Sequence, residues 1–239
     1  MIWDVAFSKR LQHEAVRFDL QIEFASSARR LVLFGPSGAG KTQTLRVLAG
    51  LSGVVQGRVQ VAGRTLLDTD AGIALTPQQR RLGHVFQDYA LFPHLNVRQN
   101  IAFALRSGWR NPGRVERYPA VEQWLATLGL GGVAELYPHQ ISGGQRQRTA
   151  LARALVNEPT ALLLDEPFAA LDQGLRRQLR AELAELLNQV QIPMLMITHD
   201  EDDARALAEE VIEMRDGRVE AGGGQARMLS ARAGTEEPT

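Results

Sequence analysis

At residues 35–42 the chain reads Gly35-Pro36-Ser37-Gly38-Ala39-Gly40-Lys41-Thr42, and this stretch decides the fold. It matches the phosphate-binding pattern G-x-x-x-x-G-K-[ST]. The apolar run at residues 31–34 reads as a buried strand, and residues 43–49 read as the helix that follows. Glycines let a backbone close around an anion with its N–H groups pointing inward, so we expect residues 35–42, the phosphate loop, to bind a nucleoside triphosphate.

Two side chains of the phosphate loop carry its chemistry. Lys41 is placed to reach the β- and γ-phosphates, and the hydroxyl of Thr42 to bind Mg²⁺. The alternative is a glycine-rich turn with a chance Lys-Thr after it. The strand before the loop and the helix after it argue against that alternative.

Composition bounds the class of protein. The 239 residues suffice for one large α/β domain, or for a core with one inserted subdomain. Lys plus Arg equals Asp plus Glu at 27 each, so bulk charge does not favour a nucleic-acid partner. The absence of cysteine excludes disulfides, thiolate metal sites and a cysteine nucleophile. No apolar run approaches about 18 residues and the N-terminus lacks a secretory signal, so we expect a cytoplasmic protein.

The predicted fold class is α/β: a P-loop NTPase with a mostly parallel core sheet, an antiparallel β subdomain and an inserted helical subdomain. Strands are expected at residues 16–24, 82–86, 160–164 and 193–198, and hairpins at 59–67, turning near Gly63, and 211–219. From about residue 88 to 155 the sequence pattern is mostly helical and is broken by prolines, which predicts a helical insertion. The nucleotide-binding domain would span residues 1–230, with its core at 1–87 and 156–230, and residues 231–239 would form a disordered tail.

A long amphipathic helix is predicted after residue 172. Its apolar face comprises Leu175, Leu179, Leu183, Leu186, Leu187 and Val190. Its charged residues, Arg176, Arg177, Arg180, Glu182 and Glu185, are expected to form a solvated face.

Asp165 and Glu166 follow the apolar run 162–164, at the carboxyl end of a predicted buried strand. Ligands of open α/β sheets bind at that end. Asp165 is placed to hold Mg²⁺ through its water shell alongside Thr42, and Glu166 to orient and deprotonate the water that attacks the γ-phosphate. The alternative is a polar pair that caps the next helix, which Pro167 would favour.

Three further motifs occur: Val85-Phe86-Gln87-Asp88, Ile141-Ser142-Gly143-Gly144-Gln145 and Ile197-Thr198-His199-Asp200. With the phosphate loop and the Asp165-Glu166 pair they make five motifs in one order. Over residues 1–230 the chain therefore resembles the ATP-binding cassette (ABC) ATPases. The resemblance implies ATP and Mg²⁺ as ligands.

The resemblance also implies roles for single residues. Gln87 would sense Mg²⁺ and the attacking water, and His199 would contact the γ-phosphate and hold the catalytic geometry. Residues Ser142, Gly143, Gly144 and Gln145, the signature loop, would bind the γ-phosphate held by a second copy, and Asp172 would cross the interface. Without the resemblance His199 would read as a core or cap histidine. We expect structural or surface roles for His13, His84, His94 and His139.

The chain departs from the family pattern at two places. Ile141 stands where Leu is common in the signature, a volume-conserving change. The aromatic residue that stacks on adenine in many members should fall near Leu11, Gln12 or His13, none of which is a good stacking platform. Phe7 or Phe18 are the alternatives.

The resemblance implies three kinds of partner and no nucleic acid. The partners are a second copy in a head-to-tail homodimer that closes on ATP, transmembrane permease subunits and, indirectly, an external substrate-binding protein. The protein would then be peripheral on the inner face of the cell membrane through the permease. Residues 89–97 are apolar and resemble an importer surface that receives a short permease helix, although burial against the helical insertion would also explain them.

Residues 63–68, 73–87 and 192–195 resemble molybdate importer ATPases in particular. Those proteins usually continue into a C-terminal oxyanion-binding domain, for which this chain has no room. Importers of sulfate, tungstate or thiamine are alternatives. A soluble ABC ATPase acting on DNA or ribosomes would typically carry two cassettes or long basic insertions. Glu166 and His199 argue against a module that uses ATP only as a switch.

Overall fold

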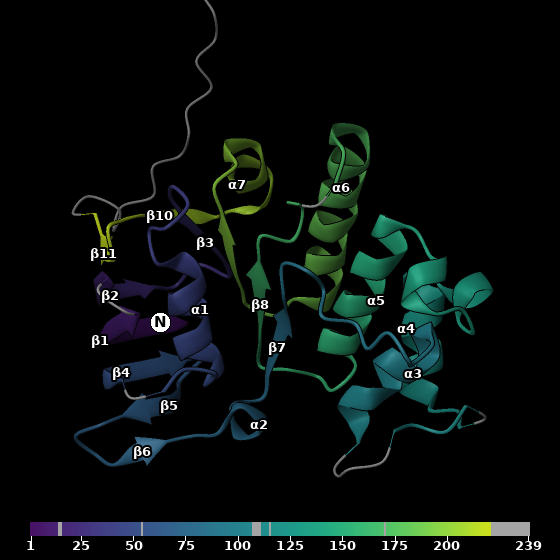
Figure 1. The fold of residues 1–239 in the computed structure, drawn as a ribbon, viewed down its shortest axis with the longest axis horizontal. Coiled ribbons are helices and arrows are strands. Elements are labelled where there is room, and N and C mark those ends of the chain that lie inside the picture. Colours follow the sequence, from purple (N-terminus) through teal and green to yellow (C-terminus); the bar gives the residue numbers. More distant parts are fainter. Residues whose placement is uncertain (14–15, 54, 107–110, 115, 170, 221–239) are drawn as a thin grey trace, which may run out of the picture.

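The sheet is the centre of the fold. The computed structural model describes residues 1–13, 16–53, 55–106, 111–114, 116–169 and 171–220 (Figure 1). In these residues eleven strands form one sheet in the order β6-β5-β4-β1-β2-β11-β10-β3-β9-β8-β7. The tail expected at residues 231–239 lies outside the described residues.

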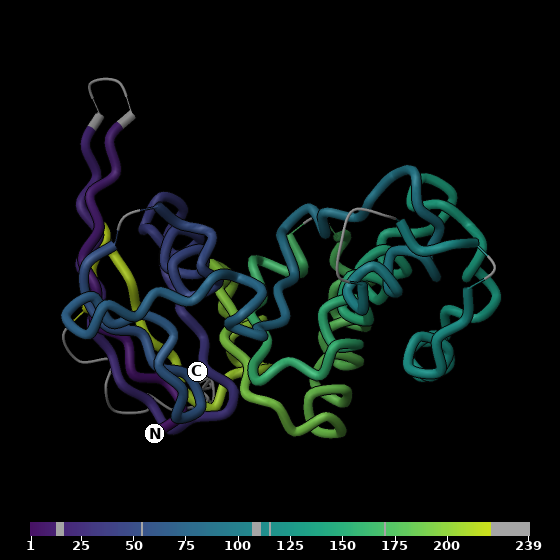
Figure 2. The backbone as a smooth tube through the Cα atoms, turned by 90° about the horizontal axis from the view of Figure 1, so that it is seen from below, coloured from purple at the N-terminus to yellow at the C-terminus, as the bar shows by residue number. Residues whose placement is uncertain are grey.

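One half of the sheet is antiparallel. It consists of β1 (Trp3–His13), β2 (Val16–Ser26), β4 (Gln56–Val61), β5 (Arg64–Asp68) and β6 (Ile73–Ala74). In β2, Leu20, Ile22 and Phe24 are buried and the residues between them are exposed, which confirms the strand predicted from alternation. The hairpin predicted to turn near Gly63 is also confirmed. β1 and β2 extend as a two-stranded ribbon beyond the rest of the sheet (Figure 2).

The other half is a parallel sheet. It consists of β10 (Glu210–Arg215), β3 (Arg30–Phe34), β9 (Met194–Thr198), β8 (Ala161–Asp165) and β7 (Leu82–Val85). β11 (Arg218–Val219) pairs with β10 and β2 and joins the two halves. Every residue of β8 and β9 is buried, as their continuous apolar runs predict. The predicted α/β class with a mostly parallel core sheet is confirmed.

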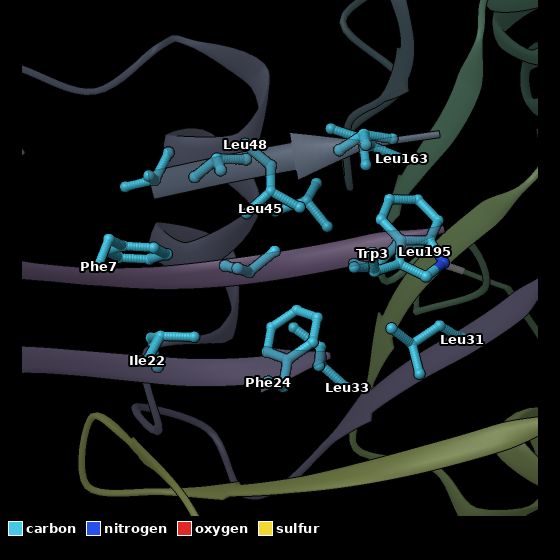
Figure 3. Packing of buried hydrophobic residues seen from close by; sticks show 14 of the residues in the cluster. Trp3, Phe7, Ile22, Phe24, Leu31, Leu33, Leu45, Leu48, Leu163 and Leu195 are labelled. Carbon is cyan, nitrogen blue, oxygen red and sulfur yellow. The ribbon is translucent and has the colours of Figure 1, made fainter. Parts of the chain in front are cut away.

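Helices cover both faces of the parallel sheet. The helices of the described part are α1 (Lys41–Ala49), α2 (Pro77–Arg80), α3 (Val97–Ala102), α4 (Pro119–Thr127), α5 (Gly143–Leu155), α6 (Gln173–Val190) and α7 (Glu201–Leu207), with 3₁₀ turns η1 (Phe103–Leu105), η2 (Gly131–Val133) and η3 (Pro138–Gln140). On the two faces of the parallel sheet lie α1 and α6. Leu163 and Leu195 point to the core around α1 and β1 (Figure 3), whereas Leu162 and Met196 point to the core that includes α6. Each helix of the described part is too short or too polar to cross a bilayer.

A third apolar cluster lies among α3, α4 and α5. It includes Val97, Ile101, Val121, Leu125 and Ile141. In Figures 1 and 2 these helices stand beside the sheet and extend away from it. On this ground we propose that residues 88–155 fold as an inserted helical subdomain.

A buried arginine closes the end of α1, the helix that follows the phosphate loop. Arg80 is 4% exposed, and one guanidinium nitrogen donates to the carbonyls of Val47 and Leu48, each at 2.7 Å. Its Nε donates to the carbonyl of Leu75 at 2.9 Å. These carbonyls of α1 are the negative end of the helix dipole, which a cation stabilises. Arg80 therefore ties α2 to the base of α1.

We predict that Arg80→Met destabilises the protein by roughly 2–3 kcal/mol, because it keeps the apolar stem and removes the hydrogen bonds that Arg80 donates to the carbonyls of Val47, Leu48 and Leu75. Urea unfolding monitored by circular dichroism measures the change. Arg81→Met is the matched control, since the neighbouring Arg81 is exposed. Equal unfolding free energies for the two variants would contradict this role of Arg80.

Candidate active site

The parallel sheet brings the sequence-predicted residues to one edge. β3 runs into the phosphate loop, β8 ends at Asp165 with Glu166 next, and β9 ends at Thr198 with His199 next. Gln87 lies in an exposed turn two residues after β7. Because these four strands are parallel, their carboxyl ends share one edge of the sheet. Residues far apart in the sequence thus gather around one place.

The backbone of the phosphate loop requires its glycines. Gly40 has φ 95° and precedes α1 without a side-chain cap, which leaves the first N–H groups of the helix open to an anion. A Cβ at Gly40 would lie 3.0 Å from the side chain of Leu20, and one at Gly35 would lie 2.1 Å from the carbonyl oxygen of Met214. Larger residues at these two positions would displace the loop.

Lys41 places a buried ammonium group in this loop. Its side chain donates to the carbonyl of Gly35 at 2.6 Å and to that of Pro36 at 2.9 Å, and Lys41 is only 4% exposed. Burial lowers the pKa of Lys41, while the nearby carboxylates of Glu166 and Asp165 act in the opposite direction. A desolvated cation beside open N–H groups fits a phosphate group.

Thr42 and Asp165 are in direct contact beside the phosphate loop. The hydroxyl of Thr42 donates to Oδ1 of Asp165 at 3.2 Å, and Asp165 is 6% exposed. Burial raises the pKa of Asp165, and the Glu166 carboxylate adds to this effect, although the Thr42 hydrogen bond opposes it. Mg²⁺ prefers such hard oxygen ligands and usually takes one or two carboxylates plus phosphate oxygens. The residues present therefore fit Mg²⁺.

Glu166 and His199 are in direct contact. His199 Nδ1 lies 3.2 Å from Glu166 Oε1, with the His199 side chain 48% and the Glu166 side chain 15% exposed. Glu166 has a left-handed backbone (φ 44°), and its N–H donates to the carbonyl of Ile197 at 3.1 Å. A strained glutamate held by the neighbouring strand is typical of a functional position. The sequence analysis assigned the two residues separate roles and did not predict this contact.

The signature loop lies elsewhere in the chain. Ser142 caps α5, because its hydroxyl accepts from the N–H of Gln145 at 3.2 Å while the Gln145 side chain accepts from the N–H of Ser142 at 2.9 Å. Asp172 caps α6 in the same way, accepting from the N–H of Leu175 at 3.0 Å. Figure 1 shows α5 on the far side of β7 and β8 from α1. One copy of the chain therefore does not bring the signature loop to its own phosphate loop.

The structure separates the aromatic candidates. Phe7 is buried in the core (Figure 3), so its ring faces other side chains and not a ligand. Phe18 is half-buried, and a Cβ at Gly40 would meet its ring at 3.2 Å. It pairs across β1 and β2 with Leu11, one of the positions that family spacing indicates. His13 has a side chain outside the described part.

The expected solvated face of α6 is partly wrong. Arg177 is exposed, but Arg176 and Arg180 pair with the buried Asp203 on α7. The i, i+4 spacing of Arg176 and Arg180 places both on one side of the helix, and this was the sequence signal that they could share one acidic partner. Glu182 is also paired, with Arg148 on α5.

Comparison with known proteins gives a family and several relatives. Residues 19–169 match the family model described as ABC transporter. The chain is 42% identical over 202 residues to the sulfate/thiosulfate import ATP-binding protein CysA of Synechocystis sp., covering 84% of this chain and 54% of the relative. It is 40% identical over 220 residues to the molybdenum import ATP-binding protein ModC of Albidiferax ferrireducens, covering 92% and 58%. The chain thus spans little more than half the length of these curated relatives.

A solved structure matches over nearly the whole chain. It is the dimeric structure of a post-hydrolysis state of the ATP-binding cassette MJ0796 bound to ADP and Pi. The TM-score is 0.74 at 28% identity, covering 92% of this chain and 97% of that one.

We predict that Asp165→Asn stabilises the ligand-free protein at neutral pH. The raised pKa means that folding disfavours the ionised carboxylate, so the charge costs stability at pH 7 and the cost fades as pH falls towards the ordinary value of 3.8. Thermal unfolding in EDTA should therefore show a higher midpoint for the variant at pH 7 and a smaller difference in acid.

Asp19→Asn is the control, because the hydrogen bond from Arg10 lowers the pKa of Asp19 and its ionised form is favoured in the fold. Asp19→Asn should bring no gain. A lower midpoint for Asp165→Asn at pH 7 would contradict the burial argument.

Proposed function

The chain belongs to the ABC transporter family, and from this premise we propose that it is the ATP-hydrolysing subunit of an importer. The observation that carries the proposal is the meeting of Lys41, Thr42–Asp165 and Glu166–His199 at one edge of the parallel sheet. Such an edge is where open α/β sheets bind ligands. The relatives named above are import ATP-binding proteins.

The phosphate groups of ATP would lie in the phosphate loop. The open N–H groups at the start of α1 and the ammonium of Lys41 would bind the β- and γ-phosphates, with Lys41 exchanging its two carbonyl acceptors for phosphate oxygens. Thr42, Asp165 and Gln87 would hold Mg²⁺. When bound, Mg²⁺ neutralises negative charge on the phosphate oxygens. The ring of Phe18 borders the loop at Gly40.

Glu166 would act as the general base. Its carboxylate takes a proton from water, the water oxygen forms a bond to the γ-phosphorus, and the bond to the β–γ bridging oxygen breaks with ADP as the leaving group. His199 would hold Glu166 in place, donating from Nδ1 to Oε1 when that nitrogen carries the proton. Its exposed ring edge then remains free to reach the γ-phosphate.

A second copy would complete each site. The signature loop begins the 13-residue helix α5, away from the phosphate loop of the same chain. A helix N-terminus binds anions, and the matching solved cassette is dimeric. We therefore propose a head-to-tail homodimer in which residues 142–145 reach the γ-phosphate held by the other copy, with Asp172 at the interface.

A groove between the sheet and the helical insertion would receive the permease. The cavity measures about 400 Å³, and its lining includes His84, Phe86, Phe92, Phe103 and Arg153. Residues 89–97 were expected either to be buried against the helical insertion or to receive a permease helix. Tyr89, Leu95 and Val97 are buried, and Phe92 lines the groove, so different residues of this segment could serve each purpose. Closure of the dimer around ATP would move this groove and with it the bound permease helix. Binding to the permease would place the protein at the inner face of the membrane.

Molybdate or a related oxyanion is the proposed cargo. The resemblance of residues 63–68, 73–87 and 192–195 to molybdate importer ATPases supports it, as does the 40% identity to ModC over most of this chain. Sulfate is an alternative, because the chain is 42% identical to the sulfate/thiosulfate import ATP-binding protein CysA. Similar relatives are also named for Fe(3+) ions and for spermidine/putrescine, and tungstate and thiamine remain alternatives from the sequence.

We predict that Glu166→Gln binds ATP, loses hydrolysis by about 10²-fold or more, and accumulates a dimer with Mg-ATP, because the amide cannot accept the proton. Phosphate release and light scattering after size exclusion measure the two effects. Adding Lys41→Ala should abolish the dimer, whereas adding Lys9→Ala, at the only other lysine, should not. Parental hydrolysis by Glu166→Gln would refute the catalytic assignment. An unaltered chain that binds ATP without turnover would favour a switch module.

We predict that molybdate stimulates the ATPase when this chain is reconstituted in liposomes with the permease and binding protein of adjoining genes. The external binding protein selects the cargo in this scheme, so the comparison uses sulfate, thiamine, Fe³⁺ and spermidine under the same conditions. Stimulation by one of these and not by molybdate would overturn the cargo and leave the importer function standing.

A further inference from the structure

A charge cluster lies behind His199. Its centre is Asp203 on α7, which is 1% exposed. Arg176 donates from Nε and Nη2 to its two oxygens, and Arg180 lies 2.7 Å from Oδ1 through Nη2. The hydroxyl of Thr198, at the end of β9, also donates to Asp203 at 3.3 Å. Asp203 thus joins α6, α7 and the end of β9.

The same cluster fixes both neighbours of His199. The N–H of Asp200 donates to Oγ1 of Thr198 at 3.1 Å, and the N–H of Asp203 donates to Oδ1 of Asp200 at 3.1 Å. Arg176 also approaches Asp200, with Nη1 3.3 Å from Oδ2. His199 lies between these fixed residues with its ring on Glu166. The cluster therefore restrains the chain on both sides of His199.

Arg176 also connects the cluster to Asp172, the residue that caps α6. The N–H of Arg176 donates to the carbonyl of Asp172 at 2.9 Å, in the first turn of α6, and Asp172 caps that helix. Arg180 follows one turn later on the same side of the helix. A rigid helical segment thus connects the residue proposed at the dimer interface to the loop that carries His199.

Stability alone is a weak reason for this arrangement. Taking a carboxylate out of water is costly, and buried ion pairs often contribute no more to stability than apolar side chains of similar volume. Several directional hydrogen bonds do, however, specify one orientation of the groups they join. The two arginines balance Asp203 and Asp200, so the cluster is neutral and complete in itself.

We propose that Arg176, Arg180 and Asp203 form a positioning clamp that holds His199 against Glu166. Through this clamp the position of His199 depends on how α6 packs at the dimer interface. The clamp acts through His199 and touches no ligand. The proposal rests on the ATPase function proposed above.

The test is the steady-state ATPase activity of the full chain carrying Arg176→Gln or Asp203→Asn. A displaced catalytic group can cost tenfold or more, so kcat should fall about tenfold while KM for ATP stays within about twofold. Arg177→Gln is the matched control, since Arg177 is the exposed neighbour on α6. It should keep the parental kcat.

A double-mutant cycle with His199→Ala separates positioning from general stability. If the clamp acts through His199, adding Arg176→Gln to His199→Ala should lower kcat no further. With Glu166→Gln added, Arg176→Gln should still give the ATP-dependent dimer. Equal additional loss in the His199→Ala background, or loss of the dimer, would overturn the proposal.

Arg176→Lys covers the case in which Arg176→Gln does not fold. It keeps the charge but not the forked contacts, so its kcat should lie between those of the parent and Asp203→Asn, and a parental kcat would overturn the clamp. Failure of the underlying ATPase assignment is distinguishable, because the unaltered chain would then show no hydrolysis that depends on Glu166.

Discussion

The register of β3, β9 and β8 is the constraint on which the site depends. Phe34 pairs with Thr198, and Asp165 pairs with Ile197, so these strand ends lie level with one another. A shift of one residue in β8 would turn the Asp165 side chain to the opposite face of the sheet and away from Thr42. The buried faces of β8 and β9 oppose such a shift, since alternate residues fill two different cores. Packing of the interior thus sets the positions of the polar groups at its edge.

Local patterns in the sequence predicted most of the fold, because each one reports the burial of its own segment. The alternation in β2, the apolar runs of β8 and β9 and the turn at Gly63 are of this kind. The Glu166–His199 contact was not predictable in this way, since it depends on how β8 pairs with β9. The misreading of Arg176 has the same origin. The polar face of an amphipathic helix is normally solvated, and only the tertiary position of α7 makes this part an exception.

The site stores unfavourable interactions in the ligand-free protein. Lys41 and Asp165 are buried charges, and Glu166 has a left-handed backbone. Proteins commonly break their local rules at functional positions and compensate elsewhere. A phosphate beside Lys41 and a cation beside Asp165 would each replace water that burial has removed. Ligand binding and fold stability are therefore expected to be strongly linked at this edge of the sheet.

The capping of α5 decides which groups the signature loop can offer to a second copy. The N–H groups of Ser142 and Gln145 are taken up by the reciprocal cap. Those of Gly143 and Gly144, the first two residues of the helix, have no acceptor within it. A Cβ at Gly143 would lie 3.3 Å from Leu171, just before α6, and one at Gly144 would lie 3.3 Å from Leu179 on α6, so the glycines also let α5 pack closely on this part of the chain. In the proposed dimer the direction of the N–H groups of Gly143 and Gly144 therefore depends on α6, the helix that also carries the clamp on His199. The signature loop and the catalytic residues would thus be coupled through α6.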